Sequence, residues 1–397
     1  MSDSKAYFYI LELINCYAAV FYSNFLFFYM RNRFGFGEMQ NLLLAALNGL
    51  IYIFAARKGG AFAQKFGAIR SIYIGLAGFA CAMTAGLLLH NNIPAQILVF
   101  ALWSISVCFI WPAIEGIVCE GCRNKLSDMV GYYNIVWAIG SAVSYFSAGM
   151  LLEHFGMQSL FWIPLSLVCV AIVSLTIITL LRKKQVVVPY SADKAVIANE
   201  LTTASKKQFM YMAWLANPLA YVAINTVLPL APSISERIGL STGTAGIVCS
   251  AWMFARLATF IVLRRWDGWH YKFKLLAGSL IVLPVCFTLL VFAKSVPLVL
   301  VAQTGFGIAI GLAYYSSLYY SMNASKNLES HGGLHDSMIG VGQLLGPVLG
   351  AGSLLLLPSS SLAGVWSVSG LLTIGFGALL YMRRSGKKQN IINHEPE

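Results

Sequence analysis

The chain has 397 residues, of which 58% are hydrophobic and only 11% are charged, and its mean hydropathy is +0.72. A water-soluble domain needs many more charged side chains to cover its surface, so this composition excludes that class and indicates a protein solvated by lipid. The net charge of +12 would suit nucleic acid, but the basic residues fall in short clusters between apolar segments, so no nucleic-acid partner is expected.

Apolar segments long enough to cross about 30 Å of hydrocarbon as helices follow one another along the chain. Six lie at 7–31, 38–57, 67–90, 94–122, 128–152 and 159–181, and six more at 208–236, 241–265, 272–293, 297–322, 332–357 and 361–382. We therefore predict an all-α integral membrane protein with twelve transmembrane helices in two six-helix bundles. The bundles comprise residues 1–184 and 208–384, joined by a linker at 185–207 and followed by a polar tail at 385–397.

Lys and Arg are distributed unevenly over the connections between these segments. If both termini lie in the cytoplasm, 22 of the 27 Lys and Arg fall on the cytoplasmic side and 4 on the other, with Arg256 inside a segment. Cytoplasmic loops retain basic residues, and one missed or invented helix would destroy this alternation. The distribution predicts an even number of spans and a plasma-membrane protein, with the bacterial inner membrane as the expected location.

The eight cysteines lie almost all inside apolar segments, so no disulfide framework is expected. Cys119 and Cys122 have the spacing of a metal-binding or redox pair of cysteines. No second pair or histidine cluster completes four ligands, so no metal is expected. No phosphate-binding loop, nucleophile elbow or pair of catalytic carboxylates stands in a soluble segment. We therefore expect neither a cofactor nor an enzymatic activity.

The loop after the second segment resembles a signature of the major facilitator superfamily. It reads Gly60-Ala-Phe-Ala-Gln64-Lys-Phe-Gly67-Ala-Ile-Arg70, against the family's G-x-x-x-D-R-x-G-R-[RK]. The glycines and a basic residue match, whereas Gln64 replaces the usual Asp. The resemblance implies a role for these residues in gating, but the charged cytoplasmic latch that the Asp forms in the family is put in doubt.

Two further local sequences add to this resemblance. Gly342-Gln-Leu-Leu-Gly346-Pro347-Val-Leu-Gly350 has the spacing of the family's G-x-x-x-G-P-x-x-G antiporter pattern, but it lies in the eleventh helix instead of the fifth. Small residues let helices approach closely and proline introduces a kink, which suits a gate, although ordinary tight helix packing is the alternative. Residues 264–268 weakly repeat the first signature after the eighth segment.

The resemblance implies the superfamily's fold, in which two pseudo-symmetric bundles hold a substrate near the midplane. It also implies a secondary transporter that moves a small organic solute by alternating access, with protons as the expected coupling ion and with efflux or uptake left open. The expected partners are a small-molecule substrate, protons and the bilayer, and the expected state is a monomer. The alternatives are a non-transporting sensor or scaffold on the same fold, or an intramembrane enzyme built on residues 115–120.

Ionisable groups inside the apolar segments are rare and are therefore candidates for substrate or ion binding. Glu12 and Asn15 share a face of the first segment, and Glu115 lies in the fourth. Arg256 lies roughly 13 Å from the cytoplasmic end of the eighth, at 1.5 Å per residue. We expect it to face Glu12, Glu115 or a wet cavity. A permanent pair would be structural or part of a gate, whereas a titrating pair would serve coupling or substrate binding.

Aromatic and amide side chains decorate the segments that line the cavity in the superfamily. Asn217, Tyr221 and Asn225 recur at helical spacing on the seventh segment, and Gln303 and Tyr315 lie on the tenth. Such surfaces suit a moderately hydrophobic or hydroxylated solute better than a multiply charged one. Interfacial belts and core packing are the alternative explanation for any single aromatic.

Asp336 stands at the expected start of the eleventh segment. A carboxylate in the first turn of a helix is stabilised by the helix dipole, so capping explains this residue without further function. A proton-sensing gate is the alternative.

Overall fold

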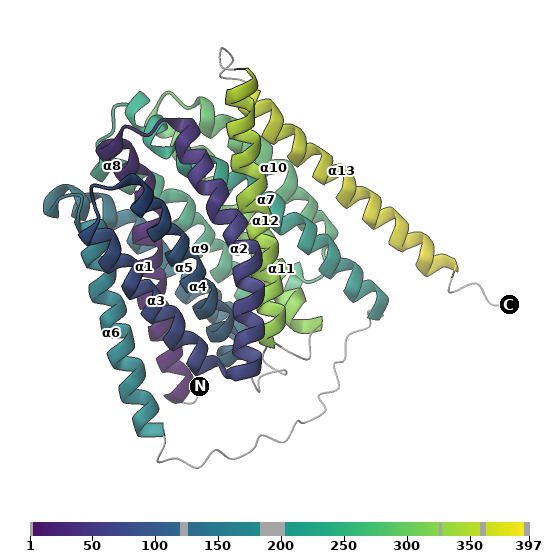
Figure 1. Ribbon diagram of the computed structural model, residues 1–397. Coiled ribbons are helices and arrows are strands. Elements are labelled where there is room, and N and C mark those ends of the chain that lie inside the picture. Colours follow the sequence, from purple (N-terminus) through teal and green to yellow (C-terminus); the bar gives the residue numbers. More distant parts are fainter. Residues whose placement is uncertain (1–2, 120–125, 183–202, 325–327, 358–362, 393–397) are drawn as a thin grey trace.

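A computed structural model describes residues 3–119, 126–182, 203–324, 328–357 and 363–392 of the chain (Figure 1). Within these residues, the regular secondary structure is entirely helical, and twelve helices are long and apolar enough to cross a membrane. Most of their ends fall within about five residues of the predicted ones. The predicted fold class is therefore confirmed.

The first half of the chain forms six long helices: α1 (Asp3–Phe34), α2 (Glu38–Phe66), α3 (Ala68–Leu88), α4 (Ile93–Cys119), α5 (Leu126–Phe155) and α6 (Ser159–Arg182). The second half contains α7 (Thr203–Arg237), α8 (Thr242–Cys249), α9 (Ala251–Arg265), the 3-10 turn η2 (Asp267–Trp269), α10 (Phe273–Phe292), α11 (Val296–Ala324), α12 (Leu328–Leu356) and α13 (Ala363–Ile392). We call the end of the bundle where α1 begins and α13 ends the terminal face, and the opposite end the far face.

Four details depart from the predicted segments. α2 continues to Phe66, so residues 60–66 of the predicted loop signature are the end of a helix. The eighth crossing is interrupted at Ser250, so α8 and α9 together form one span. α12 begins at Leu328, ahead of the predicted segment, and α13 continues to Ile392, so the predicted polar tail starts as helix. Most of the predicted linker, and the predicted cytoplasmic residues Arg123, Lys125 and Lys326, lie outside the described residues.

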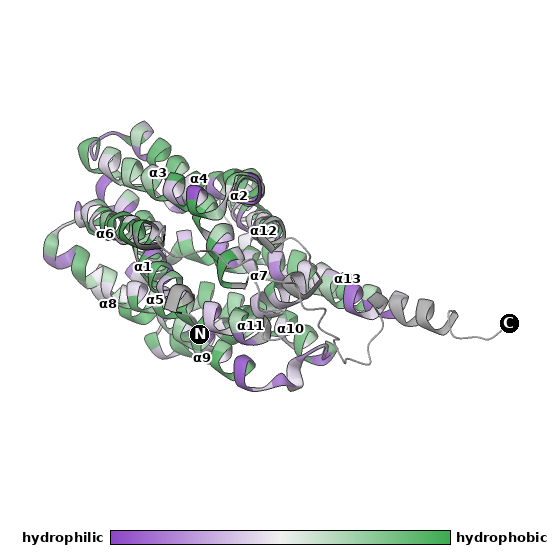
Figure 2. Ribbon diagram, turned by 90° about the horizontal axis from the view of Figure 1, so that it is seen from below, coloured by the Kyte–Doolittle hydropathy of each residue, from purple (hydrophilic) through white to green (hydrophobic). Residues whose placement is uncertain are grey.

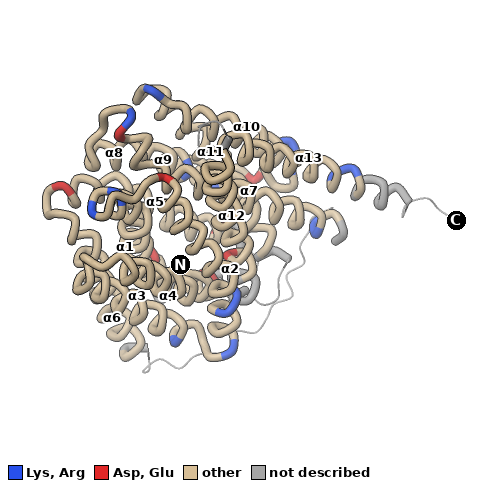
Figure 3. The backbone as a smooth tube through the Cα atoms, turned by 45° about the horizontal axis from the view of Figure 1, so that its top comes forward, with Lys and Arg blue, Asp and Glu red and all other residues tan. Residues whose placement is uncertain are grey.

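The outer surface of the bundle is apolar because its helices face lipid. Leu98, Trp366 and Ile374 each expose about 70% of their surface, and Figure 2 shows hydrophobic residues along most helices, with hydrophilic ones gathered in the connections. Figure 3 places Lys and Arg mainly at the helix ends. This pattern agrees with a multi-pass membrane protein, whose charges avoid the hydrocarbon layer.

Close packing inside the first half depends on two glycines of α2 and its following turn. Gly59 lies against the carbonyl of Cys108, which Pro112 leaves without its usual helical N–H partner, and a Cβ at position 59 would overlap that carbonyl. Gly67 joins α2 to α3 with φ of +98°, a conformation that favours glycine. Both features bring α2, α3 and α4 together.

The two halves meet along two lines of helix contact. α12 packs along α2, and α5 packs against α8 and α9. Gly49 of α2 approaches the backbone of Leu344, and Gly340 of α12 approaches that of Ile53, at 2.7 Å from an added Cβ to the Ile53 nitrogen. These contacts leave the space between the halves to be filled by the side chains of α1, α4, α7 and their neighbours.

Candidate functional site

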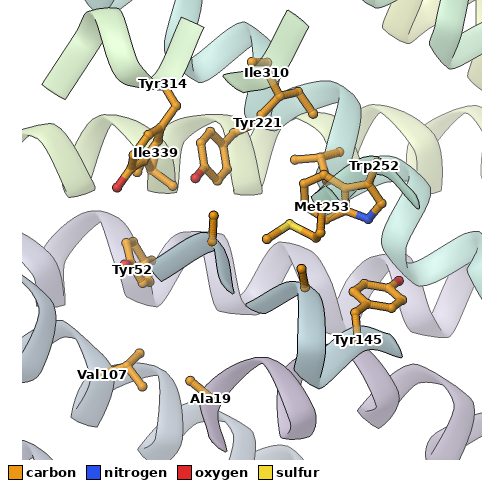
Figure 4. Close-up of a cluster of buried hydrophobic side chains, with 14 of the residues drawn as sticks. Ala19, Tyr52, Val107, Tyr145, Tyr221, Trp252, Met253, Ile310, Tyr314 and Ile339 are labelled. Carbon is orange, nitrogen blue, oxygen red and sulfur yellow. The ribbon is translucent and has the colours of Figure 1, made fainter. Parts of the chain in front are cut away.

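A cavity of about 140 Å³ lies between the halves, and both halves line it. Figure 4 shows part of its wall, with Tyr221, Tyr314 and Met253 of the second half facing Tyr52 of the first. The full lining consists of Val20, Ser23, Asn24, Phe27, Ala45, Asn48, Tyr52, Phe100, Trp103, Trp111, Glu115, Tyr133, Trp137, Ser141, Tyr221, Ile224, Asn225, Leu228, Trp252, Met253, Arg256, Tyr314, Asp336, Ile339 and Gln343.

Arg256 is 1% exposed and is surrounded by aromatic rings instead of carboxylates. Its guanidinium carbon lies 4.5 Å from the ring centroids of both Trp137 and Tyr314, 5.3 Å from that of Phe260 and 5.9 Å from that of Tyr221. Aromatic faces attract a cation, and more strongly away from water. Because Trp137 belongs to the first half, this aromatic cage joins the halves around one positive charge.

The hydrogen-bonding capacity of Arg256 is hardly used by the described residues. Its guanidinium donates to the Tyr221 hydroxyl at 3.4 Å, and its Nε has no partner among them. The ion pairs found in the described part of the chain join Arg31 to Glu236 and Arg264 to Asp128. The expected pairing of Arg256 with Glu12 or Glu115 is therefore wrong, and the expected alternative, a cavity, is what Arg256 faces.

Three buried carboxyl groups lie in or beside the cavity. Glu115 and Asp336 line it, and Glu115 Oε2 and Asp336 Oδ2 have no hydrogen-bond partner among the described residues. Glu12 is fully buried behind the wall, where it accepts a hydrogen bond from the Cys16 thiol at 2.9 Å. Glu12 and Glu115 belong to α1 and α4 of the first half, and Asp336 belongs to α12 of the second. Buried acids therefore come from both halves.

Amides complete the polar lining. Asn48 of α2 donates to Gln343 of α12 at 3.5 Å, which links the halves inside the cavity, and Asn48 Oδ1 has no partner in the described part of the chain. Asn225 donates to the carbonyl of Tyr221 at 3.0 Å, a bond within α7. Polar groups are thus spaced around an otherwise aromatic wall, as in sites for small organic ligands.

The predicted binding candidates divide into two groups. Glu115, Arg256, Tyr221 and Asn225 line the cavity, whereas the others are buried in the surrounding structure. Those others are Glu12, Asn15, Asn217, Gln303 and Tyr315.

Two of the residues outside the cavity have clear structural contacts. Gln303 accepts a hydrogen bond from the backbone N–H of Trp252 at 3.2 Å, beside the interruption between α8 and α9. Tyr315 packs edge-on against Trp269 of η2, with ring centroids 5.2 Å apart. Their contacts support the packing alternative at these two positions.

Asp336 does not cap its helix. α12 begins at Leu328, about two turns earlier, so Asp336 lies inside the helix and cannot satisfy the unpaired N–H groups of the first turn. It is 3% exposed and faces the cavity, while the preceding His335 bonds the Ser317 hydroxyl at 3.0 Å. The capping explanation is wrong because the helix extends further into a segment that is polar in sequence.

Sequence reasoning missed several lining residues. Asn48, Gln343 and Trp252 were not singled out, and neither was Trp103. Asn48 and Gln343 are uncharged polar residues inside apolar segments, which is a usable signal. Trp103 and Trp252 offer no such signal, because tryptophan is equally suited to lipid-facing and core positions.

Comparisons with known proteins agree with this architecture. The sequence pattern of the family described as Major Facilitator Superfamily matches residues 8–347. The chain belongs to this superfamily. A comparison with curated proteins found no match.

Several solved structures of the superfamily's transporter fold are similar to the chain. The nucleoside transporter NupG shares 13% identity over 96% of this chain and 99% of its own, with a TM-score of 0.70. The human organic anion transporter MFSD10 (TETRAN) shares 14% identity over 94% and 98%, with a TM-score of 0.68. A bacterial homologue of the human drug peptide transporters PepT1 and PepT2 shares 14% over 96% and 99%, with a TM-score of 0.69. At these identities the likeness concerns the fold alone.

In this superfamily member, polar contacts join the two halves at the far face. Arg31 of α1 pairs with Glu236 of α7 and donates to Ser233 at 2.9 Å. Nearby, the Glu153 carboxylate of α5 accepts the N–H of Gly243 at 2.8 Å, at the start of α8, where a negative charge is favoured.

Other contacts between the halves lie at the terminal face. Arg264 of α9 approaches Asp128 of α5 at 3.7 Å and lies 3.7 Å from the ring centroid of Tyr132. Ser337 of α12 donates to the carbonyl of Ile53 of α2 at 2.7 Å, next to the cavity-lining residues Asp336 and Tyr52. The cavity therefore lies between two separate sets of contacts.

The superfamily signature spans the end of α2 and the start of α3, and Gln64 replaces its usual Asp. Gln64 and Arg70 are exposed and take part in none of the ion pairs of the described residues, while Gly60 is buried and Gly67 forms the turn. The charged contact at this face instead uses Arg264, in the segment that weakly repeats the signature.

The glycines of the second signature pack α12 against its neighbours. Gly342 and Gly346 lie against the carbonyls of Pro218 and Val222 of α7, and Gly350 lies against Leu42 of α2. Pro347, which follows Gly346, is also buried.

Among the described residues, no group of three or more His, Cys, Asp or Glu is arranged to hold a metal ion.

Proposed function

We propose that this protein is a proton-coupled secondary transporter that moves a small organic solute through the central cavity by alternating access. The observation that carries the proposal is the position of the cavity: both halves line it, and separate contacts between the halves lie toward each face. A site of this kind can open to one side when one set of contacts breaks and the other holds.

Proton coupling is supported by Glu115 and Asp336. Both carboxyl groups line the cavity, and neither takes part in an ion pair among the described residues. Ionisable groups inside a membrane span are costly and characteristically mark ion or proton pathways. The similar structures are of proteins named for nucleosides, organic anions and peptides, so the likeness alone does not choose a solute.

The charge distribution supports an orientation with the terminal face in the cytoplasm. Arg57, Lys58, Lys65 and Arg264 lie toward the terminal ends of their helices, whereas Arg31 lies at the far end of α1. Basic residues are retained on the cytoplasmic side of a plasma membrane. Labelling Lys206 with a membrane-impermeant amine reagent in intact cells, compared with inside-out vesicles, would test this: reaction in intact cells would contradict it.

The function itself is tested by flux into proteoliposomes. Purified protein is first screened by thermal shift against metabolites and drugs, and the hits are then followed as labelled solutes under an imposed pH gradient. We expect the double variant Glu115→Gln, Asp336→Asn to lose accumulation driven by the pH gradient while it still exchanges solute across the membrane. Glu38→Gln, an exposed acid at the far face, is the matched control and should accumulate solute normally.

The outcomes separate coupling from transport. If the double variant accumulates solute as well as the unaltered protein does, protons are coupled elsewhere or not at all. If solutes bind but none crosses the membrane in either direction, the protein is a sensor or scaffold on a transporter fold.

A further inference from the structure

We propose that the cavity binds an organic monoanion that carries one planar ring, with the anionic group held by Arg256. This inference rests on the proposed transport function and names the substrate class of the same site. It starts from the position of the guanidinium, which is fully buried, lines the cavity and contacts four aromatic rings.

The aromatic cage leaves Arg256 free to bind an anion. Rings attract the cation through their faces but accept none of its N–H groups in strong hydrogen bonds, and the Tyr221 hydroxyl at 3.4 Å is a long contact. A guanidinium carries five donors in a planar fork that matches a carboxylate in a bidentate pair. A carboxylate partner from the chain would occupy that fork, and the described residues supply none.

One positive charge also limits the charge of the ligand. Among the described residues that line the cavity, Arg256 is the only Lys or Arg, and Glu115 and Asp336 line it too. A dianion would bring a second negative charge toward these acids with no second cation to bind it, and like charges at short range repel strongly in a medium of low dielectric. The lining therefore favours a single negative charge.

The remaining wall suits a ring. Four tryptophans line the cavity, at 103, 111, 137 and 252, and Trp103 stacks on Phe100 with centroids 5.5 Å apart and planes at 8°. The indole N–H groups of Trp103 and Trp111 have no hydrogen-bond partner in the described part of the chain, and buried polar groups of this kind favour a ligand that supplies an acceptor.

The volume of the cavity sets the size of that ring. It is about 140 Å³, close to the ~150 Å³ of an engineered cavity that holds one benzene molecule. Asn48 also lines the cavity, and its Oδ1 has no partner among the described residues, so a small rotation of its amide would let it accept a hydrogen bond from a hydroxyl on the ring. A single hydroxylated ring with one carboxylate satisfies these features together.

Three probes that share a 4-hydroxyphenyl ring and differ in charge test the inference. They are labelled 4-hydroxybenzoate, 4-hydroxybenzamide and 4-hydroxybenzylamine, which are an anion, a neutral molecule and a cation at neutral pH. Binding to the purified full-length protein is measured by equilibrium dialysis, and counterflow of each probe is measured in proteoliposomes. We expect the anion to bind about tenfold or more tightly than the amide, as a charge-assisted hydrogen bond provides.

Variants at Arg256 identify the anchor. Arg256→Gln should abolish the preference for the anion, and Arg256→Lys, which keeps the charge but loses the fork, should retain part of it. The matched control is Arg237→Gln, at an exposed arginine at the far end of α7 whose side chain donates to the Val291 carbonyl. A thermal melt of each variant shows whether it is folded, and Arg256→Lys keeps the test valid if Arg256→Gln fails to fold.

Each result supports or overturns the inference. It is overturned if the amide or the amine binds as tightly as the anion, if Arg256→Gln binds the anion normally, or if none of the three probes binds. Counterflow of the amine or amide without that of the anion also overturns it while leaving transport intact. If the anion binds through Arg256 but shows no counterflow, the proposed transport fails and the anion site stands.

Discussion

Arg256 illustrates how a membrane span holds a cation without a neighbouring carboxylate. Each aromatic contact of a desolvated cation contributes about 2 kcal/mol, and Arg256 has four rings around it, two of them at 4.5 Å. Together these contacts offset part of the cost of burying the charge. They do so without neutralising it, so the site remains positive toward a ligand.

His270 provides a prediction about pH at the terminal face. It lies in the connection between α9 and α10, where its ring stacks on Tyr319 with centroids 4.6 Å apart. Burial lowers the pKa of His270 below its ordinary value of 6.5, and the nearby Asp267 carboxylate partly offsets this. The unfolded chain therefore takes up a proton at a pH where the folded protein still resists it, and the protein loses stability as the pH falls below about 6.5.

Replacing this histidine should remove that part of the acid sensitivity. We expect His270→Gln to lose less of its melting temperature than the unaltered protein when the pH is lowered from 7.5 to 5.5. The comparison uses the change in melting temperature between pH 7.5 and pH 5.5, because loss of the ring contact with Tyr319 lowers the melting temperature at both pH values by the same amount. His154→Gln, at an exposed position at the end of α5, is the control. Equal losses in the unaltered protein and in His270→Gln would show that His270 has no part in the effect.

Single residues could be predicted where the bilayer makes them conspicuous. Glu115 and Arg256 stand out because charges inside an apolar segment are rare, and Tyr221 and Asn225 because they recur at helical spacing. The aromatic cage could not be predicted, since Trp137, Phe260 and Tyr314 come from three different helices. Only the tertiary arrangement of those helices decides which rings meet the guanidinium.

At the scale of the helices, hydropathy predicted the crossings because each helix must bury its own backbone hydrogen bonds in lipid. The interruption at Ser250 was not predictable, since neither Gly nor Pro occupies that position. A contact between helices accompanies it: the Gln303 side chain of α11 accepts the Trp252 N–H at the start of α9. The interruption precedes Trp252, Met253 and Arg256, which all line the cavity.

The packing of α12 against α7 leads to a second prediction. A Cβ at position 346 would lie 2.6 Å from Thr226 Oγ1 and would also overlap the Val222 carbonyl, so Gly346→Ala must push the helices apart. We expect it to destabilise the fold by about 1–3 kcal/mol, as overpacking does. In the same helix Gly352 has nothing within 4 Å of an added Cβ, so Gly352→Ala should keep or raise the melting temperature, because alanine favours a helix.

Melting of both variants in detergent, followed by circular dichroism, compares the two positions under one set of conditions. A melting temperature of Gly346→Ala equal to that of Gly352→Ala would show that α12 does not need the glycine for its contact with α7.

At the scale of the whole molecule, the two faces are held by contacts of similar strength. The far face has the Arg31–Glu236 pair, which is partly exposed, and the terminal face has the Asp128–Arg264 pair, which is also partly exposed. Exposed ion pairs contribute about 0–1 kcal/mol each. That is little against the stability of the fold, but it is enough to change the ratio of two nearly equal conformations severalfold.

Breaking each pair should therefore shift the accessibility of the cavity in opposite directions. A cysteine placed at Ser23, which lines the cavity, reports access by a membrane-impermeant thiol reagent in vesicles of known orientation, measured as the labelling above that of the native cysteines. We expect Glu236→Gln to increase labelling from the far face and Asp128→Asn to increase it from the terminal face, each about two- to fivefold, given contributions of up to ~1 kcal/mol. Glu38→Gln should change neither. If both pair variants raise labelling from the same side, the two ion pairs do not hold opposite gates. The opening of the far face must then depend on other contacts between the halves, such as that of the Glu153 carboxylate with the N–H of Gly243.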